Sequence, residues 1–187
     1  FDMEGNKLSG TGTVPGEASI YTQIFKARPD VQSIVHAHAP MCVVMGLAKL
    51  PISAIHLQSS RFGEGLPVYP LPLYVSEVGD GDAIVDTIGD APGMTINGHG
   101  IVTVGRSIDE ATINAIYMER TAKIEHAARL MGFEGVTVAH KEMLAENRNK
   151  MQERGRDLSR PRTDHSDEWR YYLRKIERGE PWNRSWT

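Results

Sequence analysis

The sequence has few of the features that mark secreted, membrane-bound or nucleic-acid-binding proteins. Cys42 is its single cysteine, which excludes a disulfide within the chain and favours a reducing, cytoplasmic setting. No apolar run approaches the roughly 20 residues of a membrane-spanning helix, and no signal peptide is recognisable. The formal net charge of −3 argues against non-specific binding to nucleic acid. With 40% hydrophobic residues in a chain of 187 and no internal repeats, we expect an ordinary globular core.

Apolar spacing and turn residues divide the chain into expected helices and strands. Residues 1–13 are expected to form a hairpin or strand edge, and the proline-rich residues 66–75 an edge strand or extended connection. The predicted helices span residues 15–28, 41–49, 80–88, 107–130, 141–156 and 166–178, and the predicted strands lie within residues 31–40, 52–57, 94–96 and 101–104, with a polar loop at 58–65 and a linker at 158–165. The last helix carries an apolar face, formed by Trp169, Tyr172, Leu173 and Ile176. Cys42, among apolar neighbours, is expected to be a packed small residue rather than a nucleophile.

Two histidines lie toward the end of the predicted strand within residues 31–40. Alternate side chains of a strand point to the same side, so His36 and His38 project from one face, about 7 Å apart along the backbone. A buried imidazole without a partner costs a few kcal/mol and therefore needs water, a hydrogen bond or a metal. The pair fits either a metal site or two partly exposed histidines at a strand end.

A third histidine lies between two β-branched runs. Gly98 and Gly100 flank His99, and glycine allows backbone conformations that let the imidazole be held tightly at a strand end. Asn97-Gly98 is also a common hairpin turn, in which His99 would simply be exposed.

Two charged residues complete the candidates. Glu17 lies in the first turn of a predicted helix, where an acid also has a purely structural use, because it complements the helix dipole. Arg61 lies in the polar loop at 58–65 and can either bind an anionic substrate group or remain solvated.

Three histidines and an acid can together form a metal site with an open coordination position and a proton carrier beside it. Three neutral imidazoles with a free fourth position are the ligand set of a catalytic divalent metal, rather than of a closed structural site.

The order of these motifs resembles the class II aldolase/adducin family over residues 1 to about 135. The motifs are Pro15-Gly16-Glu17 before a helix, the ARPDV run at 27–31, His36-Ala37-His38, Gly98-His99-Gly100 and the long helix after Ser107. The resemblance implies that His36, His38 and His99 are metal ligands and that Glu17 is the catalytic acid or base. It implies an α/β fold: an α/β/α sandwich around a nine-stranded, mainly antiparallel sheet. It also implies a C4 homotetramer with active sites at subunit interfaces.

The resemblance ends shortly before Lys141, where the composition becomes rich in charged residues, and we expect this to divide the chain. Residues 1–140 would form the class II aldolase-like metal-binding domain, and residues 141–187 a charged helical extension that packs on the core or on a neighbouring subunit. Roughly the first third of the family fold would precede Phe1.

Departures from the family pattern bear on the substrate. Sugar-phosphate aldolases of the family hold phosphate with two serines, where this chain has Pro15 and Gly16, so a non-phosphorylated substrate is expected. Those aldolases have a tyrosine where this chain has Leu57, and the family's epimerases have an aspartate where it has Gln58. The loop at 58–65 and the final aromatic helix look more like the branch that contains 3,4-dihydroxyphthalate decarboxylase and related lyases.

The resulting expectation is a divalent-metal-dependent carbon–carbon lyase that decarboxylates a catechol-type carboxylate through a metal-stabilised enolate, in the breakdown of aromatic compounds. Zinc is the expected metal, and manganese, cobalt and iron are alternatives. Arg61, His56 and Tyr172 are the candidate residues for binding a small carboxylate substrate. Two alternatives stay open: a retro-aldolase of a small hydroxy-keto acid, and a non-catalytic, adducin-like interaction module.

Overall fold

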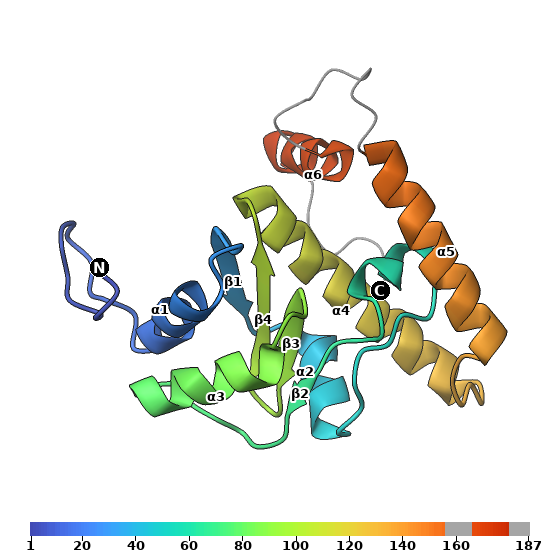
Figure 1. The fold of residues 1–187 in the computed structure, drawn as a ribbon, viewed down its shortest axis with the longest axis horizontal. Coiled ribbons are helices and arrows are strands. Elements are labelled where there is room, and N and C mark those ends of the chain that lie inside the picture. Colours follow the sequence, from blue (N-terminus) through green and yellow to red (C-terminus); the bar gives the residue numbers. More distant parts are fainter. Residues whose placement is uncertain (156–165, 180–187) are drawn as a thin grey trace.

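The computed structural model of the chain describes residues 1–155 and 166–179 (Figure 1). The helices are α1 (Ala18–Ala27), α2 (Pro40–Leu47), the 3-10 helix η1 (Leu57–Phe62), α3 (Val78–Ile88), α4 (Ile108–Leu130), α5 (Val138–Gly155) and α6 (Asp167–Glu177). The strands are β1 (Ser33–Ala37), β2 (Val68–Tyr69), β3 (Gly93–Ile96) and β4 (Gly100–Gly105). No helix in these described ranges is long and apolar enough to cross a membrane.

The strands form one sheet in the order β1-β4-β3-β2. The β1–β4 and β3–β4 pairs are antiparallel, and the short β2 joins β3 in parallel at one edge. The expected α/β class with a mainly antiparallel sheet is therefore confirmed, and the described residues supply four strands. The position of β2 at the edge agrees with the proline content of its surroundings, because proline cannot donate a ladder hydrogen bond.

Helices cover both faces of the sheet, as the α/β/α arrangement requires (Figure 1). Helices α1 and α3 pack on one face, which we call the α1/α3 face, over Met94, Ile96, Val102 and Val104. Helices α2 and α4 cover the opposite α4 face, where Ile101 joins Met45, Ile113 and Met118. The alternation of Ile101 with Val102 follows from the two-residue period of a strand. Cys42 is fully buried on the α4 face, and burial raises the pKa of its thiol, as expected for a packed cysteine.

Helix α4 begins where the sequence predicts it. The Ser107 hydroxyl accepts a hydrogen bond from the backbone N–H of Glu110 at 3.4 Å, which satisfies one of the donors left free at a helix start. Thr103 on β4 donates from its hydroxyl to the Ala111 carbonyl, and Asn114 donates to the Val104 carbonyl. These buried bonds fix the helix against β4, the central strand that pairs with both β1 and β3.

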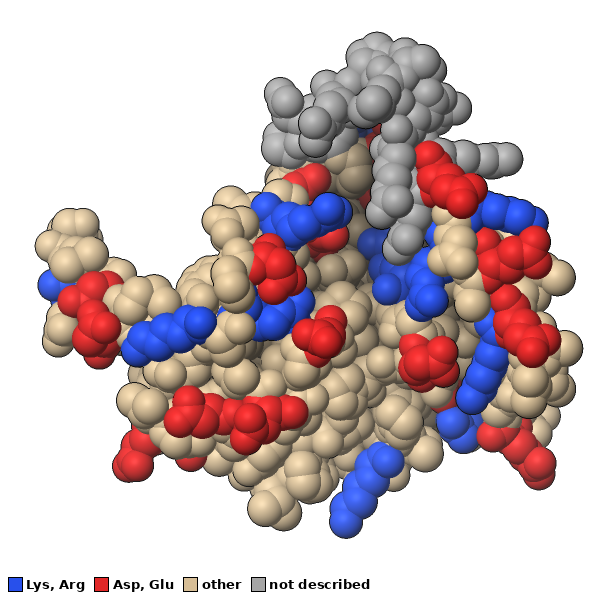
Figure 2. Space-filling model, in the orientation of Figure 1, with Lys and Arg blue, Asp and Glu red and all other residues tan. Residues whose placement is uncertain are grey.

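Helix α6 also has the predicted cap, with the Ser166 hydroxyl accepting from the Trp169 N–H at 3.1 Å. Trp169 and Tyr172 pack against the core of the α4 face, whereas Ile176 on the same apolar stripe is exposed. Figure 2 shows acidic and basic side chains interspersed over one face of the molecule, with a broad uncharged area at its centre.

Two predicted elements are wrong. Residues 1–13 form no strand; instead the Asp2 carboxylate closes a turn by accepting from the backbone N–H groups of Glu4 and Asn6. The strand predicted over residues 52–57 is reduced to a single bridge between Ile52 and Leu66.

The reason for the missing strand lies in its backbone donors. The Ser53 N–H donates to Glu125 Oε2, and the N–H groups of Ile55 and His56 both donate to the Ser59 hydroxyl. With these three donors bound to side chains, the segment cannot form a continuous ladder with a neighbouring strand.

Other boundaries shift by a few residues. Helix α1 begins at Ala18 rather than Pro15, and α5 begins at Val138, so the expected domain boundary after residue 140 falls inside a helix. Helix α5 packs on η1. The division into two domains stays a prediction, and the linker expected at 158–165 lies outside the described residues.

Candidate metal centre

The pairing of β1 with β4 brings the three sequence-distant histidines together. In this antiparallel register His36 lies opposite Val102 and Ala37 opposite Ile101, so the end of β1 meets the β3–β4 turn. His38 follows β1 and His99 occupies the turn, so both lie at the same end of the paired strands β1 and β4. Ile34 packs into the core of the α1/α3 face, and His36 shares its side of the strand, toward the start of α1 where Glu17 lies.

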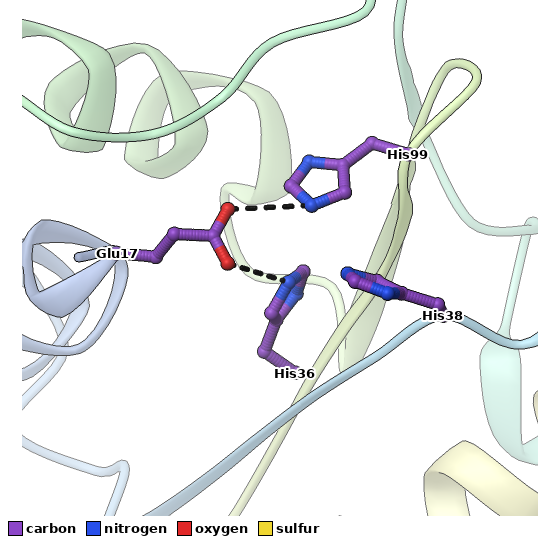
Figure 3. A group of neighbouring side chains, drawn as sticks. All are labelled: Glu17, His36, His38 and His99. Atoms are coloured by element: carbon purple, nitrogen blue, oxygen red, sulfur yellow. Dashed lines mark ion pairs between the residues drawn. The ribbon is translucent and has the colours of Figure 1, made fainter. Parts of the chain in front are cut away.

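Glu17, His36, His38 and His99 form one compact cluster (Figure 3). Each of the four offers one ligand atom, and these atoms all lie within 4.8 Å of one another. The ring centroid of His36 is 5.3 Å from that of His38 and 5.0 Å from that of His99. Among the described residues this is the only group of three or more histidine, cysteine or acidic side chains that meets this geometry.

Two backbone carbonyls orient the imidazoles. His36 Nδ1 lies 2.9 Å from the Ile101 carbonyl oxygen, and His99 Nδ1 lies 2.7 Å from the Leu73 carbonyl oxygen. A carbonyl only accepts, so Nδ1 of each ring carries the proton and Nε2 of each neutral ring keeps its lone pair. This is the arrangement in which histidine binds a metal through Nε2.

Both Nε2 atoms face the same carboxylate. Glu17 Oε2 lies 3.3 Å from His36 Nε2, and Glu17 Oε1 lies 3.3 Å from His99 Nε2. When both rings are neutral, with the proton on Nδ1, lone pairs face lone pairs across these gaps. Glu17 Oε1 and His36 Nε2 are buried without a hydrogen-bond partner in the described part of the chain, which costs about 1–3 kcal/mol for each such group. A divalent cation between these atoms would satisfy all of them, so the residues present fit a metal ion.

Electrostatics around His36 favour its neutral form. Burial lowers the pKa of His36, and the neighbouring imidazoles of His99 and His38 act in the same direction, although the Glu17 carboxylate opposes them. A neutral imidazole is the form that ligates a metal. His38 is the exposed member of the cluster, so a bound ion would be open to a small molecule on its side.

The start of α1 aims Glu17 at the histidines. Glu17 occupies the N-cap position, yet its side chain makes no cap hydrogen bond. Gly16 and Glu17 form a turn before the helix, closed by a hydrogen bond from the Ala18 N–H to the Pro15 carbonyl. The Glu17 carboxylate points across to the imidazoles rather than toward the helix N–H groups (Figure 3). The purely structural role considered for this acid therefore has no hydrogen bond to support it.

The glycines around His99 have separate uses. Gly98 has a φ of +65°, a left-handed conformation that glycine adopts without strain. At Gly100 the constraint is space, because a Cβ atom there would lie 2.6 Å from the Ala37 carbonyl oxygen and 3.0 Å from His38 Cδ2. The absence of a side chain at 100 lets β1 and its histidines approach the turn.

The chain matches a known family model over most of its length. The class II aldolase and adducin N-terminal domain model covers residues 1–126. This chain belongs to the class II aldolase and adducin family. The match includes all four residues of the cluster.

Two curated relatives of this chain carry the name of a decarboxylase. The chain is 30% identical over 131 residues to 3,4-dihydroxyphthalate decarboxylase of Arthrobacter keyseri, which covers 65% of this chain and 53% of the relative. It is 28% identical over 119 residues to the protein of the same name from Rhodococcus jostii strain RHA1, and this match covers 61% of this chain and 49% of the relative. The chain thus spans about half the length of the curated relatives it matches.

Solved structures share the class II aldolase fold. An aldolase II superfamily protein from Pseudomonas syringae superposes with a TM-score of 0.74 at 19% identity, over 96% of this chain and 70% of that one. An L-fuculose 1-phosphate aldolase superposes with a TM-score of 0.68 at 21% identity, over 79% of this chain and 70% of the aldolase chain. At these identities the likeness establishes the fold alone.

The three predicted substrate-binding residues lie away from the cluster. Arg61 lies with its guanidinium carbon 4.3 Å from the centre of the Tyr117 ring and pairs with Glu168 at 3.5 Å. His56 Nε2 lies 3.3 Å from the Thr121 hydroxyl. These contacts involve α4 and α6, on the α4 face, whereas the metal cluster opens on the α1/α3 side.

Tyr172 lines a groove of about 850 Å³ on the α4 face, beside Arg120, Lys123 and Lys175. Ala37 and Ala39 also line this groove, and they alternate along the chain with the cluster histidines. Tyr172 and the cluster therefore lie on opposite sides of β1 within one chain.

The sequence analysis did not identify the carbonyls of Leu73 and Ile101 as supports of the histidine rings. Both are main-chain atoms, so no residue type marks them. The proline-rich segment that holds Leu73 gave no signal of its contact with His99.

Proposed function

We propose that this chain is a divalent-metal-dependent carbon–carbon lyase that decarboxylates a non-phosphorylated, catechol-type carboxylate, in the breakdown of aromatic compounds. The observation that carries the proposal is the convergence of three imidazoles and the Glu17 carboxylate within 4.8 Å. Membership of the class II aldolase family and the decarboxylase relatives support the reaction class.

His36, His38 and His99 would hold the metal. His36 and His99, whose rings are oriented by carbonyls, would bind it through Nε2, and the exposed His38 would be the third ligand. A divalent cation supplies Lewis-acid stabilisation of developing negative charge, worth several kcal/mol. We propose zinc as the native ion, while three imidazoles also accept manganese, cobalt and iron.

Glu17 would carry the proton. In decarboxylation the bond between the ring carbon and the leaving carboxylate breaks, CO₂ departs, and the electron pair stays on the ring carbon. A proton from the Glu17 carboxyl group then forms the new C–H bond, and water restores the proton to Glu17. Its position beside the ligand atoms, with a side chain only 17% exposed, keeps this proton close to the reacting carbon and screened from bulk water.

Arg61, His56 and Tyr172 remain our candidates for the substrate carboxylates, acting between subunits. Because they lie across the sheet from the cluster of their own chain, we propose that they serve the metal site of a neighbouring copy. A C4 homotetramer with active sites at subunit interfaces provides such contacts. We also propose a cytoplasmic location, consistent with the single buried thiol.

The test is product analysis with the zinc-loaded protein and 3,4-dihydroxyphthalate as substrate. We expect release of one CO₂ per molecule consumed, and its loss after removal of the metal with a chelator and restoration on adding zinc back. Release of an aldehyde or pyruvate from a hydroxy-keto acid, without CO₂ from the phthalate, would favour the retro-aldolase. A protein that retains no metal after purification without chelator would favour the adducin-like module and overturn the lyase.

A further inference from the structure

Tyr74 is a large exposed side chain next to the metal cluster. It is 66% exposed, while Leu73 and Val75 on either side pack into the core of the α1/α3 face. Alternation along this extended segment turns Tyr74 outward, away from that core. An exposed aromatic side chain beside a candidate site is available to contact a ligand, through its apolar ring face and its hydroxyl group.

The backbone on both sides of Tyr74 is fixed. The Leu73 carbonyl accepts from His99 Nδ1 at 2.7 Å, and the Val75 carbonyl accepts from the Ser19 hydroxyl on α1 at 3.3 Å. One anchor is therefore His99, a histidine of the cluster, and the other is Ser19, two residues after Glu17. Such anchoring on both sides holds the Tyr74 Cα position rigidly relative to the cluster.

The Tyr74 ring lies over the residue that precedes Glu17. A Cβ atom built on Gly16 would lie 2.4 Å from the Tyr74 hydroxyl oxygen and 3.5 Å from its Cζ. The phenol thus occupies the space that any side chain at position 16 would take. Tyr74 thus follows the residue whose carbonyl binds His99, and its ring reaches the backbone at Gly16. Among the described residues, its hydroxyl has no hydrogen-bond partner.

We propose that Tyr74 is a substrate-contacting residue that selects an aromatic carboxylate, with Gly16 as the residue that leaves room for it. This deepens the proposed function and rests on it. The ring face packs against the aromatic ring of the substrate, where offset and edge contacts of aromatic pairs are favourable. The phenol O–H donates to a substrate carboxylate oxygen, which is a charge-assisted hydrogen bond.

The experiment measures binding rather than turnover. Dissociation constants of 3,4-dihydroxybenzoate and of catechol are determined by calorimetry on the zinc-loaded full chain, for the parent, Tyr74→Phe and Tyr74→Ala. We expect Tyr74→Phe to weaken 3,4-dihydroxybenzoate about tenfold and catechol less than about twofold, because a hydrogen bond to a charged group is lost only for the carboxylate. Tyr74→Ala should weaken both probes. Zinc content and Tm should match the parent in each variant, because the side chain is exposed.

Gly16→Ala supplies an independent check. Its methyl group should displace the phenol and weaken the binding of 3,4-dihydroxybenzoate about as much as Tyr74→Phe does. The double variant Gly16→Ala with Tyr74→Ala should bind this probe no more weakly than Tyr74→Ala alone, since the effects of contacting residues are not additive. Equal affinities of the parent and Tyr74→Ala for both probes would overturn the assignment of Tyr74. A parent that binds 3,4-dihydroxybenzoate through Tyr74 but releases no CO₂ from 3,4-dihydroxyphthalate would support this assignment and contradict the proposed reaction. A zinc-loaded parent that binds neither probe would overturn both.

Discussion

Glu17 Oε2 and His36 Nε2 face each other at 3.3 Å, while His36 Nδ1 bonds to the Ile101 carbonyl. The only ring proton of neutral His36 is therefore engaged on the side away from Glu17. The same relationship holds between Glu17 Oε1 and His99 Nε2. With neutral rings, two lone-pair contacts converge on one carboxylate. A divalent cation between these atoms would remove the repulsion, and this gives the metal proposal its physical basis.

His99→Ala should lose the metal and the activity together. Removing one of three imidazoles is expected to weaken zinc binding by at least about 100-fold. Loss of a residue that only supports a ligand already weakens metal binding by about 10–100-fold, and loss of the ligand itself should cost at least as much. Elemental analysis of the purified variant, beside a CO₂ assay, measures both effects. His126→Ala on α4 is the matched control and should keep the full zinc content.

Glu17→Gln should keep the metal but lose turnover. Three imidazoles remain to hold the ion, whereas an amide cannot deliver the proton, so we expect kcat to fall by about 10²–10⁴-fold. Zinc content and kcat are measured on the same preparation. A metal-free Glu17→Gln protein would show that the carboxylate is a required ligand and would contradict the role assigned to it.

Gly100→Ala should disturb the cluster although it replaces none of the proposed ligands. The new methyl group would meet the Ala37 carbonyl and the His38 ring, and overpacking of this kind costs about 1–3 kcal/mol. We expect a lower free energy of unfolding in urea and weaker zinc binding. Gly12→Ala is the control, because nothing lies within 4 Å of a Cβ atom at that position and its unfolding should be unchanged.

His56 should make the stability of the protein depend on pH. Burial lowers the pKa of His56 below its usual 6.5, and the nearby charge of Arg120 adds to this. Between the ordinary pKa and the lowered one the unfolded chain binds the proton and the folded chain does not, so the contribution of this group to stability falls as the pH falls through this window.

The measurement for His56 is urea unfolding of the metal-free protein between pH 7 and 5. The control variant is His56→Gln, whose amide can still bond to Thr121 but does not titrate. The parent should lose more stability than His56→Gln over this range, and equal losses would contradict the lowered pKa.

Local patterns were enough to predict much of the site. The two-residue period of the strand placed His36 and His38 on one side, the capping serine placed α4, and the glycines around His99 marked the turn. In each case the signal lies within a few residues of the feature it predicts. The residues alone left the convergence of these separate segments as one possibility, and the family resemblance decided in its favour.

Contacts between distant segments account for what the sequence did not reveal. Residues 52–57 have the composition of a strand, but Glu125 and Ser59 take their backbone donors, and Glu125 is 72 positions away from Ser53. The locations of Arg61 and His56 depend likewise on their packing against α4, which no pattern near either residue encodes.

The supports of His36 and His99 are main-chain oxygens, and this has a consequence for how the family can diverge. No exchange of side chains at positions 73 or 101 deletes a carbonyl group, so the ring orientation is shielded from mutation there. Residues around the ion are then free to drift toward new substrates while the ligand geometry persists. An inventory of invariant side chains would overlook the two atoms that keep the imidazoles in place.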